Sequence, residues 1–155
     1  MIDGVVRVPL RRVEDERGWF CELRRDSALP KPMRQTNVSF SRAGVIRGLH
    51  YHRRGQDDLF ACLRGTARVV VLDRGSGDTF TEDIGEDNPV AIFIPGHNAH
   101  GFEALTDILF CYHVTAEYDP DDPDEHTFPW NDPRVAHLWS TSTPILSARD
   151  AAVGS

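Results

Sequence analysis

Apolar residues in this chain recur in short runs that turn-forming residues separate. The clearest runs are residues 59–63 (LFACL), 66–72 (TARVVVL), 90–94 (VAIFI) and 108–115 (ILFCYHVT). These runs are rich in β-branched and aromatic residues, which favour strands. Turn signals such as DRGSGD at residues 73–78 return about every eight to twelve residues, a spacing typical of antiparallel sandwiches and barrels. The pattern therefore predicts an all-β fold.

Weaker alternation of polar and apolar residues predicts further strands at residues 1–10, 19–23, 34–40 and 79–85. Residues 11–18 (RRVEDERG) are mostly charged and predict a turn instead.

The character of the sequence changes after Tyr118. Residues 119–125 (DPDDPDE) are acidic and rich in proline, which predicts a solvated loop. A calcium site is the alternative, although the segment lacks the spaced ligands and glycine of a calcium loop. We expect a short helix at residues 134–139. No tandem repeat or linker divides the chain, so we predict a single domain over residues 1–155.

Composition and charge narrow the classes of partner. The formal net charge of −7 argues against a general surface for nucleic acid or anionic membranes, although a few local arginines could still bind a small anion. Cys21, Cys62 and Cys111 lie far apart in apolar runs, as buried free thiols in a reducing compartment do. We find no signal-peptide pattern and no apolar run of membrane-spanning length, and we expect a cytoplasmic protein.

Residues 44–65 concentrate the side chains that could carry out chemistry. An apolar run leads into His50 and His52, and a polar turn with Asp57 and Asp58 follows. Because side chains alternate along a strand, the two histidines would point to one side of a sheet. Two imidazoles beside two carboxylates indicate a site; the alternative is one packed and one solvated histidine.

The same stretch resembles the first motif of the cupins, which runs Gly, five residues, His-x-His, a short gap, an acid, six residues and Gly. A second cupin motif, Pro-Gly followed by His, is matched roughly further along the chain. The matching residues are Gly44, His50, His52, Asp58, Gly65, Pro95, Gly96 and His100. The gap before the acid is one residue too long. The resemblance implies a double-stranded β-helix, or jelly-roll, barrel, here with a short C-terminal helix.

A tighter resemblance, from about Asp15 to Asp150, is to the dTDP-4-dehydrorhamnose 3,5-epimerase family. Each matching stretch is short, but they occur in order and with compatible spacing. They are DERGWF at 15–20, QTN at 35–37, VIRGLHY at 45–51, IP at 94–95, AHGF at 99–102, Tyr112, WNDP at 130–133 and PILS at 144–147 through Asp150.

The resemblance implies proton removal beside the 4-keto group of a nucleotide-linked 6-deoxyhexose, through an enolate that is reprotonated on the other face. His50 falls on the family's general base, and imidazole suits that task because it titrates near pH ~6.5. Asp150 falls on the carboxylate that fixes the tautomer of this histidine. Tyr112 falls on the acid. Without the resemblance, Asp150 would be interpreted as a surface acid and Tyr112 as a half-buried strand residue.

Further residues fall on positions that bind the substrate in the family. Arg17 and Arg47 match contacts to the diphosphate, whose oxygens suit the planar guanidinium group. His100 matches a histidine in the pocket wall. The remaining positions, on or near nucleotide-sugar contacts, are Phe20, Glu22, Gln35 and Asn37.

Asp58 departs from the family pattern. The family usually has a lysine there that stabilises the enolate oxygen, and a carboxylate would repel that oxygen. Losing one such donor typically costs about a hundred- to a thousandfold in rate. One hypothesis is that His52, Arg53 or Arg54 replaces the lysine, so that Asp58 lies in the substrate site of an epimerase of altered scope, acting for example at C3 only.

Two alternatives stay open. Asp58 could restore the acid of a metal-binding cupin, with a divalent metal held by His50, His52, Asp58 and His100. Asp150 would then orient a metal-bound histidine. Otherwise the fold would serve as a non-catalytic module that binds sugar nucleotides, or as a different isomerase.

The resemblance also implies partners. We expect a small nucleotide-sugar substrate, no cofactor unless the metal alternative holds, and no nucleic-acid or membrane partner. We expect a homodimer in which the N-terminal strands cross to the partner and Arg17 acts in the neighbouring pocket.

Overall fold

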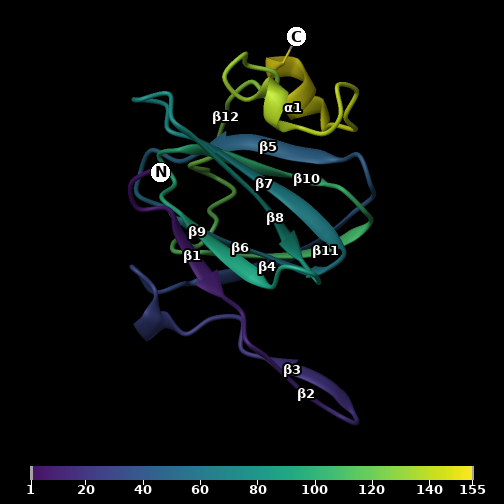
Figure 1. Cartoon of the computed structure of the whole chain (residues 1–155). Helices are drawn as coiled ribbons and strands as arrows, with labels where there is room; N and C mark the ends of the chain where they lie inside the picture. The colour runs from purple at the N-terminus through teal and green to yellow at the C-terminus, as the bar shows by residue number, and fades with distance from the viewer. Residues whose placement is uncertain (1, 155) are drawn as a thin grey trace.

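Two antiparallel sheets face each other in the computed structural model, which describes residues 2–154 (Figure 1). The first sheet has the strand order β1 (Val6–Pro9), β9 (Val90–Ile94), β6 (Asp58–Arg64), β11 (Ile108–Val114) and β4 (Gln35–Ser41). The second has the order β12 (His126–Thr127), β5 (Ile46–Tyr51), β10 (Ala99–Ala104), β7 (Thr66–Leu72) and β8 (Thr79–Gly85). The predicted all-β barrel is confirmed.

Apolar side chains fill the space between the sheets and also cover their outer faces. The inner core includes Phe60, Val71, Ile92 and Phe110. On the outer face of the second sheet, residues such as Val70 pack against the C-terminal segment, and on the outer face of the first sheet a third cluster forms. Strands covered on both faces need apolar residues at successive positions. This explains the unbroken apolar runs at 69–72 and 90–94.

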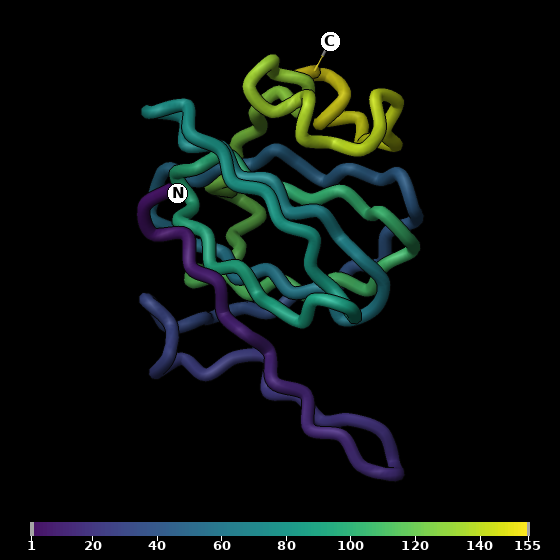
Figure 2. Tube along the Cα trace, viewed as in Figure 1, coloured from purple at the N-terminus to yellow at the C-terminus, as the bar shows by residue number. Residues whose placement is uncertain are grey.

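The charged segment predicted as a turn is a strand. β2 (Arg12–Asp15) pairs with β3 (Gly18–Cys21), and the tight turn between them occupies only residues 16–17. Figure 2 shows this hairpin, in purple, extending away from the barrel. The hairpin is solvated in the single chain, so charge at successive positions does not oppose strand formation there.

The C-terminal segment returns over the outer face of β5 (Figure 1). The helix expected at 134–139 is a short 3₁₀ turn, Ala136–Leu138. The α-helix α1 (Ala148–Val153) follows, and its first turn is capped by Ser147, whose Oγ accepts a hydrogen bond from the Asp150 N–H at 3.1 Å. The cap fixes Asp150 near the start of the helix. A second 3₁₀ turn, Asp26–Ala28, lies between β3 and β4.

The three cysteines are free; Cys62 and Cys111 are buried as expected, whereas Cys21 is only half-buried. Within residues 2–154, no helix has the length and apolar character needed to span a membrane.

Candidate functional site

A cavity of about 640 Å³ opens inside the barrel, between the two sheets. Its walls come from β5, β10 and β11 and from the start of α1. The lining includes Arg47, His50, Phe60, His100, Phe102, Tyr112, Glu125, Leu146, Arg149 and Asp150. Residues far apart in the sequence, including most of the predicted site, are therefore gathered here.

His50 and Asp150 are hydrogen-bonded across this cavity wall. The His50 Nε2 atom lies 2.9 Å from Asp150 Oδ1, and Asp150 Oδ2 accepts the Gly48 N–H at 3.2 Å. Asp150 is only 3% exposed. Burial would raise its pKa, but the contacts with His50 and Gly48 outweigh burial and lower the pKa of Asp150. Asp150 is thus a buried, ionised acceptor.

The Asp150 contact assigns the proton of a neutral His50 to Nε2, because a carboxylate can only accept. Arg149 Nη2 also lies 2.9 Å from Nε2, but a guanidinium can only donate, so both contacts cannot be hydrogen bonds of one neutral tautomer. We favour Asp150, since Arg149 is already engaged by both Glu125 oxygens at 2.8 and 3.1 Å. The free base nitrogen is therefore Nδ1, 3.9 Å from Glu125 Oε1.

Tyr112 faces this histidine from the opposite sheet, since β11 belongs to the first sheet and β5 to the second. Its ring packs edge-on against Phe60, with ring centroids 6.4 Å apart. Burial, and then the negative charges of Glu125 and Asp58, raise the pKa of Tyr112. The phenol stays protonated at neutral pH and can donate its proton.

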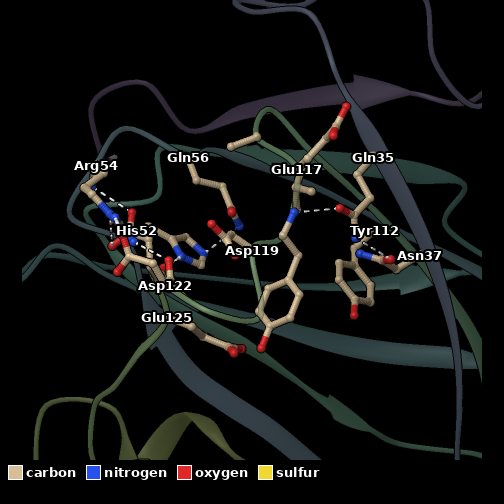
Figure 3. Close-up of a pocket in the computed structure, with 14 residues that line it drawn as sticks. Gln35, Asn37, His52, Arg54, Gln56, Tyr112, Glu117, Asp119, Asp122 and Glu125 are labelled. Carbon is tan, nitrogen blue, oxygen red and sulfur yellow. Dashed lines mark hydrogen bonds and ion pairs between the residues drawn. The ribbon is translucent and has the colours of Figure 1, made fainter.

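A second cavity, of about 490 Å³, adjoins the first and shares Tyr112 and Glu125 with it. Figure 3 shows Gln35 and Asn37 beside Tyr112 at one end of this cavity and His52 with Gln56 at the other. Gln35 donates to Asn37 Oδ1 at 3.0 Å and accepts the backbone N–H of Tyr118 at 2.8 Å. These amides form a fixed polar wall.

Arg47 lies at an exposed position on the lining of the first cavity. Its guanidinium donates to Ser41 Oγ at 2.9 Å and to the Phe40 carbonyl at 3.1 Å. Both acceptors are neutral, so its charge remains uncompensated by them and is available to an anion.

Asp58 lies beneath the cavities, 5% exposed, and is not among the residues that line either of them. Its carboxylate oxygens lie 3.5 Å from His52 Nε2 and 3.4 Å from His100 Nε2. Burial would raise the pKa of Asp58, but pairing with the two histidines lowers it. The four-residue metal set of the metal-binding alternative is thereby divided, because His50 is hydrogen-bonded to Asp150 and only the other three residues cluster.

Arg17, Phe20 and Glu22 lie outside both cavities of this chain. Arg17 pairs with Asp15 at the tip of the hairpin, Phe20 is 72% exposed, and Glu22 pairs with Arg25. The single chain does not bring these three residues to the site.

Sequence reasoning did not single out Glu125 or Arg149, which both line the first cavity. Glu125 ends the acidic segment expected to be a solvated loop. The neighbouring Asp124 carboxylate accepts the backbone N–H groups of Arg53 and Arg54, at 2.9 and 2.7 Å, and anchors the segment over the turn. The adjacency of Arg149 to Asp150 was the only sequence signal for Arg149.

Comparison with known proteins adds independent findings. A family model described as dTDP-4-dehydrorhamnose 3,5-epimerase matches residues 1–155. The spore coat polysaccharide biosynthesis protein SpsL of Bacillus subtilis is 40% identical over 149 residues, covering 91% of this chain and 98% of its own length. A dTDP-4-dehydrorhamnose 3-epimerase of Streptomyces niveus is 33% identical, covering 96% of this chain and 78% of its own length.

A solved structure is similar to this chain in both fold and sequence. It is the dTDP-6-deoxy-D-glucose-3,5-epimerase RmlC from Legionella pneumophila Philadelphia 1, in complex with dTDP-4-keto-L-rhamnose. The TM-score is 0.87 at 31% identity, and the match covers 98% of this chain and 87% of the other.

Proposed function

This chain belongs to the dTDP-4-dehydrorhamnose 3,5-epimerase family, and we propose that it epimerises a dTDP-4-keto-6-deoxyhexose through an enolate. The observation that carries the proposal is one cavity with His50 on one sheet and Tyr112 on the other. Inversion of a carbon needs a base on one face of the sugar and an acid on the other. A sugar held between the two sheets would meet both.

The proposed reaction begins at His50 Nδ1, which removes the proton beside the keto group. The resulting imidazolium is stabilised by Asp150, 2.9 Å away at Nε2, as in other histidine–carboxylate pairs. Tyr112 then returns a proton from the opposite face and receives one from solvent. The uncompensated guanidinium of Arg47 supports binding of the diphosphate at the cavity wall.

Asp58 bears on the scope of the reaction. The buried carboxylate offers no positive charge of its own to an enolate oxygen, so another group has to supply it. We propose epimerisation at C3. A double epimerase would exchange the proton at C5 as well.

Solvent exchange tests the proposal. The protein is incubated in heavy water with dTDP-4-keto-6-deoxyglucose, and deuterium at C3 and C5 is measured by mass spectrometry and NMR. We expect deuterium at C3. His50→Asn should slow this exchange by about 10²- to 10⁴-fold, because the general base is lost.

Asp150→Asn should also slow exchange, with kcat falling more than KM rises, because the amide cannot stabilise the imidazolium. His137→Gln serves as the control, since His137 is exposed and outside both cavities. The epimerase proposal is rejected if the folded protein binds the sugar nucleotide but exchanges no proton of any dTDP-4-keto-6-deoxyhexose. The chain would then be a binding module.

We further propose a homodimer whose hairpins complete the neighbouring sites. The β2–β3 arm has no core of its own and exposes Trp19 and Phe20 at 51% and 72%. Exposed aromatic residues on an extended arm are typical of a segment that packs on another chain. Arg17 would then contact the nucleotide sugar in the partner's cavity.

For location, we propose the cytoplasm. The support is three free cysteines, Cys21, Cys62 and Cys111, in a chain with a family role in sugar-nucleotide metabolism.

A further inference from the structure

Three buried side chains converge beside the first cavity. His52, Asp58 and His100 are 6%, 5% and 2% exposed. One ligand atom from each, the two Nε2 atoms and a carboxylate oxygen, lies within 4.8 Å of the others. They come from three separate segments: the residue after β5, the start of β6, and β10. The fold, and not local sequence, brings them together.

Backbone carbonyls fix the orientation of both imidazoles. His52 Nδ1 lies 2.5 Å from the Asp124 carbonyl oxygen, and His100 Nδ1 lies 2.9 Å from the Asn98 carbonyl oxygen. A carbonyl only accepts, so each Nδ1 carries the proton. In the neutral tautomers, both Nε2 lone pairs then point toward Asp58. Metal-bound histidines typically have their other nitrogen held in this way.

The spacing within the cluster suits an ion better than direct hydrogen bonds. The Nε2 to carboxylate distances of 3.5 and 3.4 Å exceed the roughly 2.7–3.2 Å of N–H···O bonds. Ligands about 2.1 Å from a tetrahedral metal lie about 3.4 Å from one another. The Gln56 amide, 3.1 Å from both His52 Nε2 and Asp58 Oδ1, closes one side of the space.

We propose that His52, Asp58 and His100 bind one divalent transition-metal ion through the two Nε2 atoms and the Asp58 carboxylate. Two imidazoles and a carboxylate suit Zn²⁺, Fe²⁺, Mn²⁺ or Co²⁺. The ion compensates the charge of the buried Asp58 carboxylate while both imidazoles stay neutral, and a buried charge is costly when it is not compensated.

The proposed site leaves the catalytic base free. His50 is held by Asp150 and lies outside the cluster, so metal binding and proton abstraction use different histidines. His100 lines the same cavity as His50 and Tyr112, which places the ion at the cavity wall. There it would supply positive charge toward a developing enolate oxygen, a role that rests on the proposed function.

Metal analysis without substrate tests the site itself. The untagged full chain is purified, its metal content is measured, and the chelator-treated protein is titrated with Co²⁺ while the visible d–d absorption is recorded. We expect about one equivalent of metal per chain and a saturable Co²⁺ spectrum. Asp58→Asn and His52→Gln should lose both, and the exposed His137→Gln should retain both. Because Asp58 is buried, circular dichroism checks that each variant is folded. If Asp58→Asn is unfolded, loss of metal in His52→Gln and His100→Gln tests the site instead.

The outcomes separate this inference from the proposed epimerase activity. Wild-type protein that is folded but binds less than a tenth of an equivalent of Zn²⁺, Fe²⁺, Mn²⁺ or Co²⁺ overturns the metal site, and deuterium exchange in that sample still tests the epimerase. Metal retained by the folded Asp58→Asn and His52→Gln variants also overturns it. Stoichiometric metal whose removal slows exchange at least tenfold supports both the site and its role. Stoichiometric metal whose removal leaves exchange unchanged supports the site and overturns the role.

Discussion

Tyr112 occupies the boundary between the two cavities, with Glu125 as the other residue that both share. Burial raises the pKa of its phenol above the usual value of about 10, and the Glu125 carboxylate raises it further. A raised pKa keeps the acid form, which can reprotonate an enolate, populated across neutral and mildly alkaline pH. The same carboxylate lies close to His50 Nδ1, so Glu125 acts electrostatically on both proposed proton-transfer groups.

The pH dependence of epimerisation follows from this environment. We expect the alkaline fall in kcat to begin above pH ~10 in the wild-type protein, since the phenol remains protonated below its raised pKa. Glu125→Gln removes a negative charge that raises the pKa, so the fall should begin at lower pH. Tyr112→Phe should reduce inversion by about 10²- to 10⁴-fold while deuterium exchange through His50 continues.

Tyr51→Phe is the matched control, because Tyr51 lies outside both cavities and should leave kcat and its pH profile unchanged. An alkaline limb that is the same in wild type and Tyr112→Phe would exclude Tyr112 as the acid.

At the residue scale, the site residues that belong to sequence motifs could be predicted. Those that reach the site only because a distant segment folds back over the barrel were missed. His50 and Asp150, a hundred positions apart, meet as expected at 2.9 Å. Glu125 and Arg149 were missed because their place depends on how the acidic segment and α1 fold back. The resemblance assigned Asp58 to the substrate site, whereas the structure buries it against two histidines.

At the scale of elements, the close antiparallel pairing of β5 with β10 determines where the base can lie. Gly48 has φ +134°, and a Cβ there would lie 2.9 Å from both the Gly101 Cα and the His100 carbonyl oxygen. Gly101 is equally confined, with the Arg47 carbonyl oxygen 2.4 Å from an added Cβ. The two glycines allow a close approach that also aims the Gly48 N–H at Asp150.

Gly48→Ala is therefore expected to destabilise the fold more than an alanine at a turn glycine with positive φ. Gly77 has φ +83° and open space around an added Cβ, so Gly77→Ala should cost only the backbone penalty of about 1–2 kcal/mol. Gly48→Ala should cost about 1–3 kcal/mol more, because the methyl group meets backbone that cannot move aside.

Urea unfolding followed by circular dichroism measures both variants. Gly48→Ala should also slow deuterium exchange, since it displaces the Asp150 contact. Equal losses of stability in the two variants would contradict the packing argument.

Strands that lie within the sheets of the barrel could be predicted closely from the sequence. The expected strands at 66–72, 79–85 and 90–94 agree with β7, β8 and β9 to the residue. β2 was missed because its mostly charged residues 12–15 lie on a solvated arm, where no core imposes an apolar alternation. The short β12 was missed because its two residues form a strand only by pairing with β5, which lies far away in the sequence.

At the scale of the whole molecule, exposed apolar side chains lie on the edge strand β4 and on the β2–β3 hairpin. Val38 and Phe40 on the edge strand β4 are 59% and 58% exposed, and Trp19 and Phe20 lie on the hairpin. An edge strand with apolar side chains invites pairing with another chain. These surfaces and the extended hairpin (Figure 2) are consistent with the proposed exchange of arms between two chains.

In the proposed dimer, the apolar side chain of Phe20 and the charge of Arg17 have different roles, which separate variants can test. Wild-type protein should have twice the 17.4 kDa chain mass in light scattering coupled to size exclusion. Phe20→Asp places a charge in the proposed interface and should yield monomers with weakened activity. Val153→Asp, which alters an exposed apolar residue on α1, should remain dimeric.

Arg17→Ala should keep the dimer mass but raise KM for the nucleotide sugar several-fold with little change in kcat, because it removes a phosphate contact and no reacting group. A monomeric wild type with full activity would show instead that each chain completes its own site, and Arg17 would then be ordinary surface charge at the tip of a solvated hairpin.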